Sequence, residues 1–197
     1  MQSTVNMFSV KVDKFKLTNI DNDMLVNYAL DMKNKLQTIS GPVIDNSWQS
    51  EDVRLHESEK LKSFYSIYEN KLNQAYHTSY NKNYKVKISL AWCSVRNHEE
   101  ITKPHYHKES FLSAVYYPQA HNEELQFLNP NPQLFGMQPA SGNRAMVEKF
   151  DEYNSEYWHV RVDTGDLLVF NSMLYHYIKP TNKQRISFAI DSIIVPN

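Results

Sequence analysis

The segment Tyr84-Lys85-Val86-Lys87-Ile88-Ser89-Leu90-Ala91-Trp92 alternates between polar and apolar residues along most of its length. Because successive side chains of a strand point to opposite faces of a sheet, this period predicts a strand with one buried face. The same period continues through most of the later sequence, in short runs separated by polar turns. Further strands are expected at 112–117, 125–128, 144–147, 157–162, 167–170, 174–178 and 186–195.

The residues before this segment have a different character. Met7–Val12 alternates and predicts a short strand, whereas 21–37 and 58–77 place apolar residues at helical spacing. Asp21 or Asn22 can cap the first helix, and Gly41-Pro42 ends that unit. Two helices followed by many short strands predict a mainly β, α+β fold, an antiparallel sandwich or barrel with helices packed on one sheet.

The 197 residues are expected to form a single domain, with a strand and supporting helices over 1–82 and the β core over 83–197. The 21 Lys and Arg residues are dispersed and the formal net charge is -1, so nucleic acid binding gains no support. The only cysteine, Cys93, excludes an internal disulfide and fits a reducing compartment. With no signal-like start and no long apolar run, a soluble, cytoplasmic protein is expected, with no membrane partner and an open oligomeric state.

Three histidines stand in a setting that favours metal binding. Pro104-His105-Tyr106-His107 places two of them at i and i+2, so on an extended chain they share a face, and His176 lies in the apolar run from Leu167. Three imidazoles on one side of a β-scaffold can hold iron or another divalent metal and leave coordination positions open. The other five histidines lack this context and are interpreted as solvated or locally hydrogen-bonded: His56, His77, His98, His121 and His159.

Arg185 and Ser187 alternate with apolar neighbours in the last strand and so share one face. An arginine and a serine placed in this way can hold a carboxylate, although a surface ion pair is the alternative for Arg185. Tyr116 and Tyr117 point to opposite faces of their strand, so one of them is expected to point into the barrel. There its hydroxyl could donate to a bound ligand, or the ring could serve the core alone.

These residues resemble the iron(II)- and 2-oxoglutarate-dependent dioxygenases with a double-stranded β-helix (jelly-roll, cupin-like) core. The closer resemblance is to a little-characterised group of oxygenases, through Trp48-Gln49-Ser50, the run from His105 to Tyr117 and the run from Gly165 to Ser187. It implies that His105, His107 and His176 bind Fe(II), and that Arg185 and Ser187, with Tyr116 or Tyr117, bind 2-oxoglutarate.

The second ligand in that superfamily is usually a carboxylate, and His107 occupies its position here. Three neutral imidazoles leave the iron with its full +2 charge, and 2-oxoglutarate would supply the missing anionic oxygen. Glu109 is the competing ligand, because His107-Lys108-Glu109 would restore a His-x-Glu pair one register further on. If His107 is the ligand, Glu109 remains available to orient one of the rings.

The resemblance implies an enzyme that couples oxidative decarboxylation of 2-oxoglutarate by O2 to hydroxylation of an unidentified substrate. Two other classes remain open: a three-histidine, cupin-like metal dioxygenase that uses no 2-oxo acid, and a non-catalytic β-helix binding module. Binding of 2-oxoglutarate distinguishes the first alternative, and metal binding distinguishes the second. The turn-rich segment 129–143 is long enough to act as a lid or binding loop.

Overall fold

The computed structural model describes residues 10–35, 44–45, 47–131, 149–152 and 155–197. The strand expected at 144–147, the Gly41-Pro42 helix end and most of the 129–143 segment lie outside these residues. Across the described part of the chain, no helix is both long enough and apolar enough to cross a membrane.

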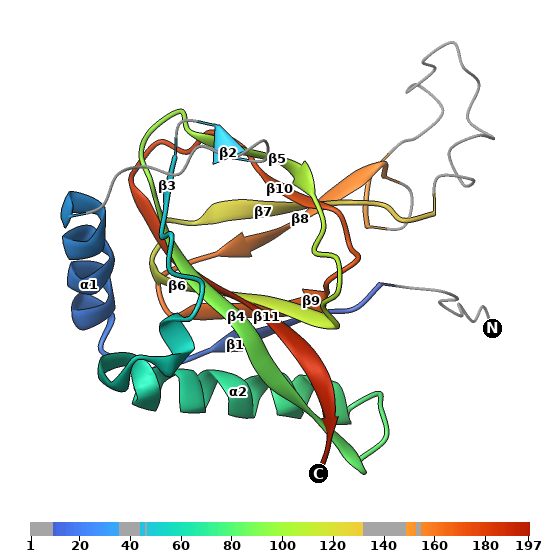
Figure 1. The fold of residues 1–197 in the computed structure, drawn as a ribbon. Helices are drawn as coiled ribbons and strands as arrows, with labels where there is room; N and C mark the ends of the chain where they lie inside the picture. The colour runs from blue at the N-terminus through green and yellow to red at the C-terminus, as the bar shows by residue number, and fades with distance from the viewer. Residues whose placement is uncertain (1–9, 36–43, 46, 132–148, 153–154) are drawn as a thin grey trace.

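The described elements are two α-helices, two short 3-10 helices and eleven strands, shown in Figure 1. In chain order they are β1 (Val12–Lys16), α1 (Asn22–Lys35), β2 (Ile44–Asp45), β3 (Trp48–Gln49), η1 (Leu55–Glu57), η2 (Glu59–Leu61), α2 (Lys62–His77), β4 (Tyr84–Arg96), β5 (Ile101–His105), β6 (Leu112–Gln119), β7 (Glu123–Leu128), β8 (Tyr157–Val162), β9 (Asp166–Asn171), β10 (His176–Ile178) and β11 (Arg185–Pro196).

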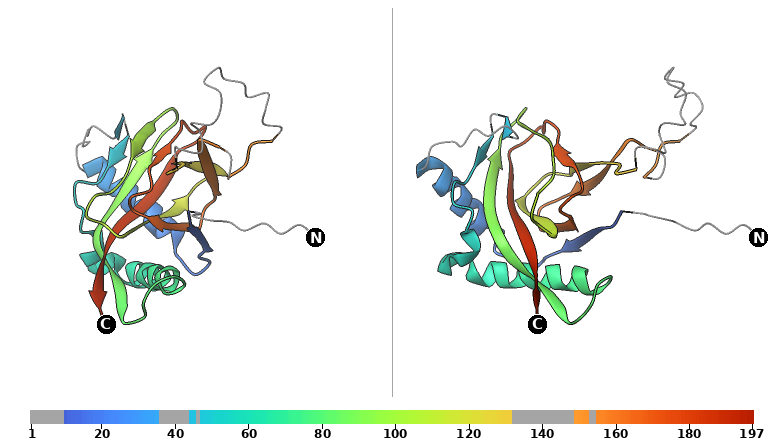
Figure 2. Two further views of the ribbon diagram at one scale, coloured as in Figure 1. Left: turned by 90° about the vertical axis from the view of Figure 1, so that its right-hand side faces the viewer. Right: turned by 45° about the vertical axis from the view of Figure 1, so that its right-hand side comes forward.

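The strands form two antiparallel sheets that face each other. Sheet A has the order β1-β9-β6-β11-β4-β3, and sheet B has the order β2-β5-β10-β7-β8. The long strands β4 and β11 pair along almost their whole length and run side by side in both views of Figure 2. Because β1, β2 and β3 come from the first 82 residues, that part of the chain contributes strands to both sheets as well as helices.

Both α-helices pack on the outer face of sheet A, as expected from the sequence (Figure 1). The Asp21 side chain accepts a hydrogen bond of 2.9 Å from the Met24 N–H and so caps the start of α1. One buried cluster joins the helices to sheet A, with Leu25, Phe64 and Phe188 among its members. A second cluster lies between the two sheets and includes Leu125, Phe127 and Phe170. The space between the sheets is therefore only partly filled by apolar side chains.

The observed strands differ from the expected ones in three respects. The first strand begins at Val12 rather than ending there, and β5 together with the short β2 and β3 had not been expected as strands. The apolar run 167–178 is divided between β9 in sheet A and β10 in sheet B. A turn separates them, in which the Leu174 N–H donates to the Asn171 carbonyl at 3.0 Å. The two strands expected at 167–170 and 174–178 are thus both present, and the difference is that the second begins at His176 rather than at Leu174.

Candidate functional site

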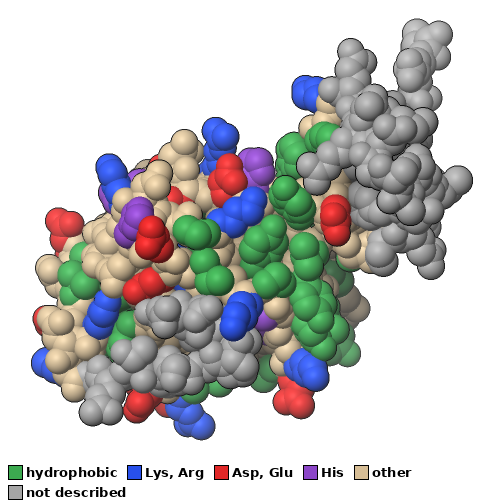
Figure 3. All heavy atoms as spheres, turned by 90° about the horizontal axis from the view of Figure 1, so that it is seen from above, with side chains coloured by type: hydrophobic (Ala, Val, Ile, Leu, Met, Phe, Trp, Pro, Cys, Tyr) green, Lys and Arg blue, Asp and Glu red, His purple; other side chains and the backbone are tan. Residues whose placement is uncertain are grey.

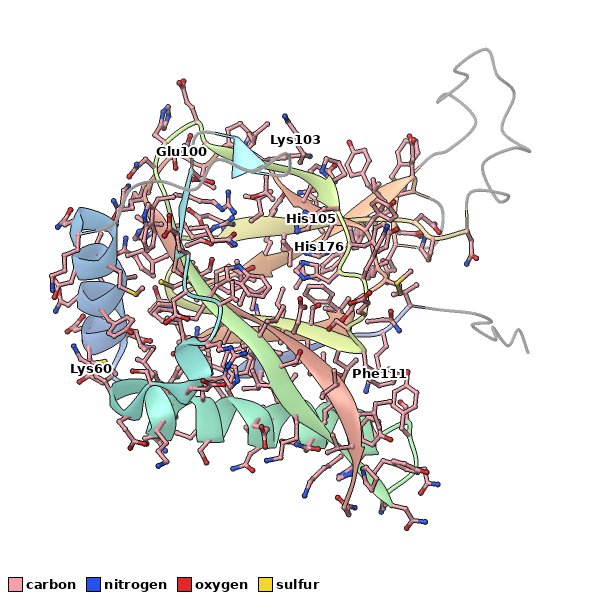
Figure 4. The ribbon with its side chains drawn as sticks, in the orientation of Figure 1. Lys60, Glu100, Lys103, His105, Phe111 and His176 are labelled. Atoms are coloured by element: carbon pink, nitrogen blue, oxygen red, sulfur yellow. The ribbon has the colours of Figure 1, made fainter. Side chains whose placement is uncertain are left out.

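His105, His107 and His176 meet between the two sheets. His105 ends β5 and pairs directly with His176 on β10. His107 lies just beyond β5, and its backbone N–H donates to the Ser172 carbonyl at 2.9 Å. One nitrogen from each ring lies within 4.8 Å of the others, an arrangement that can hold a metal ion. Figure 4 shows His105 and His176 side by side in the interior.

Hydrogen bonds fix which nitrogen of each ring is free. Nδ1 of His105 lies 2.8 Å from the Lys103 carbonyl, and Nδ1 of His176 lies 2.9 Å from the Leu174 carbonyl. Because a carbonyl can only accept, each Nδ1 carries the hydrogen and each Nε2 keeps its lone pair. Nδ1 of His107 lies 2.8 Å from Asp191 Oδ2, whereas its Nε2 is buried and has no hydrogen-bond partner in the described part of the chain. These residues fit a metal, since all three rings keep Nε2 available.

Burial keeps two of these rings uncharged. Desolvation lowers the pKa of His105 to about 4, against a rise caused by its hydrogen bond to the Lys103 carbonyl. Desolvation and the neighbouring His105 lower the pKa of His176 to about 3. Both imidazoles are therefore neutral near pH 7, the state in which a histidine can ligate a metal.

Asp191 supports this group and was missed by the sequence analysis. It is buried, and it accepts hydrogen bonds from His107 Nδ1 and, at 2.6 Å, from the Ser113 hydroxyl. Trp92 stacks against the His107 ring, with 5.6 Å between the two ring centres. Asp191 continues the alternation of Arg185 and Ser187 along β11, and this is the signal that could have revealed it.

Glu109 is not part of the histidine group. It is exposed and lies in a turn after β5, with a backbone φ of 62°. The extended conformation that would have placed His105, His107 and Glu109 on one face ends at His105. The other five histidines also lie outside any group of potential metal ligands among the described residues.

Two buried arginines lie at the other end of the same interior face. Arg185 on β11 pairs directly with Arg96 on β4, and their exposed fractions are 1% and 5%. All three guanidinium nitrogens of Arg185 are buried without a hydrogen-bond partner among the described residues. Its nearest carboxylate is that of Glu123, at 3.5 Å from Nε. Burial raises the pKa of the Glu123 carboxyl, and the charge of Arg185 opposes this rise.

The two adjacent tyrosines separate as their alternation predicts. Tyr117 lies between the sheets, and its buried hydroxyl has no hydrogen-bond partner within the described ranges; the Arg185 guanidinium carbon lies 5.7 Å from its ring centre. Tyr116 instead points to the helices, where its hydroxyl donates to Asn22 Oδ1 at 2.7 Å. Of the two tyrosines predicted to bind a cofactor, the structure brings only Tyr117 to the interior.

A cavity of about 330 Å³ connects the two ends of the site. The three histidines and Asp191 line one part of it, and the polar side chains that line the remainder include Ser94, Arg96, Thr102, Tyr117 and Ser187. Tyr106 borders the histidine end and contacts the half-exposed Tyr175, with 4.6 Å between the ring centres. Figure 3, seen from above, shows described hydrophobic side chains gathered in a band beside the grey residues.

Solved structures similar to this one share its fold at low sequence identity. A prolyl-4-hydroxylase from Pseudomonas putida matches with a TM-score of 0.55 and 12% identity, covering 93% of this chain and 92% of that chain. HygX from Streptomyces hygroscopicus, solved with nickel and 2-oxoglutarate, matches with a TM-score of 0.58 and 13% identity over 95% and 84%. A Trichoplax adhaerens prolyl hydroxylase, in complex with a hypoxia inducible factor peptide, matches with a TM-score of 0.60 and 12% identity over 92% and 83%. The predicted double-stranded β-helix core is thereby confirmed.

No curated protein matches the sequence. The family model described as "Putative 2OG-Fe(II) oxygenase" matches residues 90–191, which is more than half of the chain. The match includes all three histidines, Asp191 and both buried arginines. The chain belongs to the 2OG-Fe(II) oxygenase family and is a 2-oxoglutarate-dependent dioxygenase that uses Fe(II), as the residue pattern predicted.

Proposed function

We propose that His105, His107 and His176 hold the Fe(II) ion, and that Arg185, Ser187 and Tyr117 hold the far carboxylate of 2-oxoglutarate. The convergence of three imidazoles, each with its Nδ1 occupied, is the observation that carries the metal assignment. The buried and unpartnered guanidinium nitrogens of Arg185 support the carboxylate assignment, because a buried donor without an acceptor costs free energy until a ligand pairs with it.

The placement of Asp191 supports His107 over Glu109 as the third ligand. A carboxylate on Nδ1 fixes the ring orientation and the tautomer, and it increases the basicity of the ligating Nε2. Asp191 thus keeps a negative charge next to a ligand set that contains no carboxylate of its own. The Ser113 hydroxyl donates to the second oxygen of Asp191 and fixes the carboxylate in place.

When bound, Fe(II) supplies O2 activation, in which 2-oxoglutarate is decarboxylated to succinate and CO2 and one oxygen atom enters a substrate C–H bond. The chain's own residues orient and shield this chemistry. His105 and His176 offer neutral nitrogen donors across two paired strands. Arg185 and Tyr117 neutralise and orient a carboxylate in a place closed to solvent. Phe170 and Leu125 are among the apolar residues that line the cavity and limit the access of water.

Metal titration under anaerobic conditions tests the ligand assignment. The parent protein is expected to bind Fe(II) or Mn(II), and His105→Ala and His176→Ala are each expected to lose this binding while keeping the circular dichroism of the parent. His98→Ala, at an exposed histidine outside the group, is the matched control. If either site variant binds metal like the parent, the ion lies elsewhere.

A second titration tests the cosubstrate. The metal-loaded parent is expected to bind 2-oxoglutarate and, when O2 is admitted without a prime substrate, to release succinate slowly. Arg185→Lys is expected to keep metal binding and to bind 2-oxoglutarate more weakly, because an ammonium cannot make a two-pronged contact with a carboxylate. Metal binding without 2-oxoglutarate binding would instead favour the three-histidine dioxygenase that uses no 2-oxo acid.

We also propose a reducing compartment such as the cytoplasm. The single cysteine, Cys93, is buried as a free thiol, and Fe(II) chemistry requires the reduced ion. Localisation of the tagged full-length chain by microscopy tests this proposal, and export from the cell would contradict it.

A further inference from the structure

Arg96 is a buried cation that forms no ion pair with any of the described residues. Its Nη1 donates to the Ser47 hydroxyl at 2.8 Å and to the Ile101 carbonyl at 3.2 Å, both of which are neutral acceptors. Its Nε is buried with no hydrogen-bond partner, and no carboxylate of the described residues lies within ion-pair distance of it. An uncompensated buried charge raises the free energy of the protein. A ligand that brings a negative charge here removes this cost, and its binding is stabilised accordingly.

The position of Arg96 increases this cost. The strand register sets it directly opposite Arg185, and like charges directly opposite in a sheet destabilise each other. Burial and the charge of Arg185 lower the pKa of Arg96 to about 9. Glu123, at 3.5 Å from Arg185 Nε, pairs among the described residues with Arg185 only. With Glu123 ionised, its charge offsets that of Arg185, and the positive charge of Arg96 is left for a single ligand carboxylate to neutralise.

The two buried arginines differ in their position relative to the cavity. Arg96 lines the cavity that holds the histidines, together with Ser94 and Ser187, which pair with each other one step along the same face. Arg185 is fully buried beside Tyr117 and is not among the residues that line the cavity. A carboxylate that enters from the histidine end therefore meets Arg96 before it can reach Arg185.

We infer that Arg96 contacts the far carboxylate of the 2-oxo acid and makes this site select dicarboxylic over monocarboxylic 2-oxo acids, with Arg185 as the second, deeper cation. This inference rests on the proposed function, since it concerns the ligand of the same site. Ser94 and Ser187 can donate from the same wall. The buried hydroxyls of Thr102 and Tyr117, which have no hydrogen-bond partner among the described residues, are further donors for a bound anion.

The test compares two 2-oxo acids on the metal-loaded protein under anaerobic conditions. Both 2-oxoglutarate and 2-oxopentanoate can chelate a metal through the 1-carboxylate and the 2-keto oxygen, but only 2-oxoglutarate has a far carboxylate. Arg96→Gln removes the charge and keeps an N–H donor for Ser47 and the Ile101 carbonyl. Arg54→Gln, at an exposed arginine paired with Glu57, is the matched control.

Arg96→Gln is expected to weaken 2-oxoglutarate binding by at least about 30-fold, the lower bound for removing one partner of a buried charged pair. Its affinity for Mn(II) and for 2-oxopentanoate is expected to stay within about threefold of the parent, so the preference between the two acids falls. Arg96→Lys, which restores the charge, is expected to recover part of that preference.

Two results overturn the inference: unchanged 2-oxoglutarate affinity in Arg96→Gln, or an equal loss for both acids. The second result would mean that Arg96 acts on the fold or on the metal end, and thermal unfolding of the variant would show which. Failure of the parent to bind either acid would overturn the proposed function itself, and the two failures are therefore distinguishable.

Discussion

Replacing Asp191 by asparagine tests how the histidine group is held. The asparagine side chain would keep an oxygen that accepts from His107 Nδ1, and its amide could donate to Ser113, because a hydroxyl can accept as well as donate. The shape and the tautomer are thus retained, while the negative charge is lost. A change of this kind next to a metal ligand typically costs about 10- to 100-fold in metal affinity. We expect Asp191→Asn near the lower value, about 1.4 kcal/mol.

Asp191→Ala removes the acceptor as well as the charge, so we expect a loss near about 100-fold, or about 2.7 kcal/mol. The assay is anaerobic calorimetric titration with Mn(II), at a pH held constant for all variants. Asp13→Asn, on β1 and away from the cavity, is the matched control. Circular dichroism and thermal unfolding confirm that each variant is folded.

A double-variant cycle makes this prediction refutable. If Asp191 acts through His107, its substitution should change little in a His107→Ala background, because the contact is already absent there. An unchanged affinity in Asp191→Asn, or a full loss that persists without His107, would refute this account. In either case the hydrogen bond between the two side chains would not be what prepares the site for metal.

Three further predictions concern the buried charges and the turn before β9. Arg185→Met should lower the free energy of unfolding by about 3–5 kcal/mol, because it leaves Glu123 buried and unpaired, whereas adding Glu123→Gln should recover most of it in chemical denaturation. The metal-free protein should lose stability as the pH falls from about 6.5 towards 4. Histidines of the unfolded chain bind protons in this range, whereas His105 and His176 of the folded protein, with pKa values of about 4 and about 3, stay neutral over most of it. A melting temperature that does not fall in acid contradicts this. Gly165→Ala should cost about 1–2 kcal/mol in thermal unfolding, since φ is 88° there and glycine alone adopts that region freely, and an unchanged melting temperature would argue against strain at this turn.

The sequence predicted the strands well where alternation was local and the polar face met solvent. The strand 157–162 was predicted with the bounds of β8, and the helix at 58–77 corresponds to η2 followed by α2. The strand that begins at Tyr84 continues four residues beyond its predicted end at Trp92, to Arg96. An arginine at a strand end usually indicates solvent, but Arg96 points inward, so the sequence pattern alone could not extend the strand to it.

The histidine group could be predicted because each of its members has a local signal, and the structure brings these three residues together. Arg96 carries no such signal, and the alternation that puts Asp191 on the face of Arg185 and Ser187 does not show which side chain it meets. Asp191 reaches His107 across 84 residues of sequence, and Arg96 is assigned to the site only through the register that pairs it with Arg185. Register depends on the pairing of whole strands, so side chains that meet through it cannot be identified from a local pattern.

In the proposed assignment, the distribution of charge in the cavity matches the ligand at both ends. Neutral imidazoles at one end leave a bound divalent ion with its full charge, and the Asp191 carboxylate offsets only part of it. At the other end, two arginines and one glutamate leave one positive charge in a place closed to water. A ligand with one anionic group would satisfy one end and leave the other uncompensated, at the cost that an unpaired buried charge carries. A dianion with a carboxylate at each end, as in 2-oxoglutarate, satisfies both at once. A ligand set without a carboxylate therefore increases the dependence of this site on its cosubstrate.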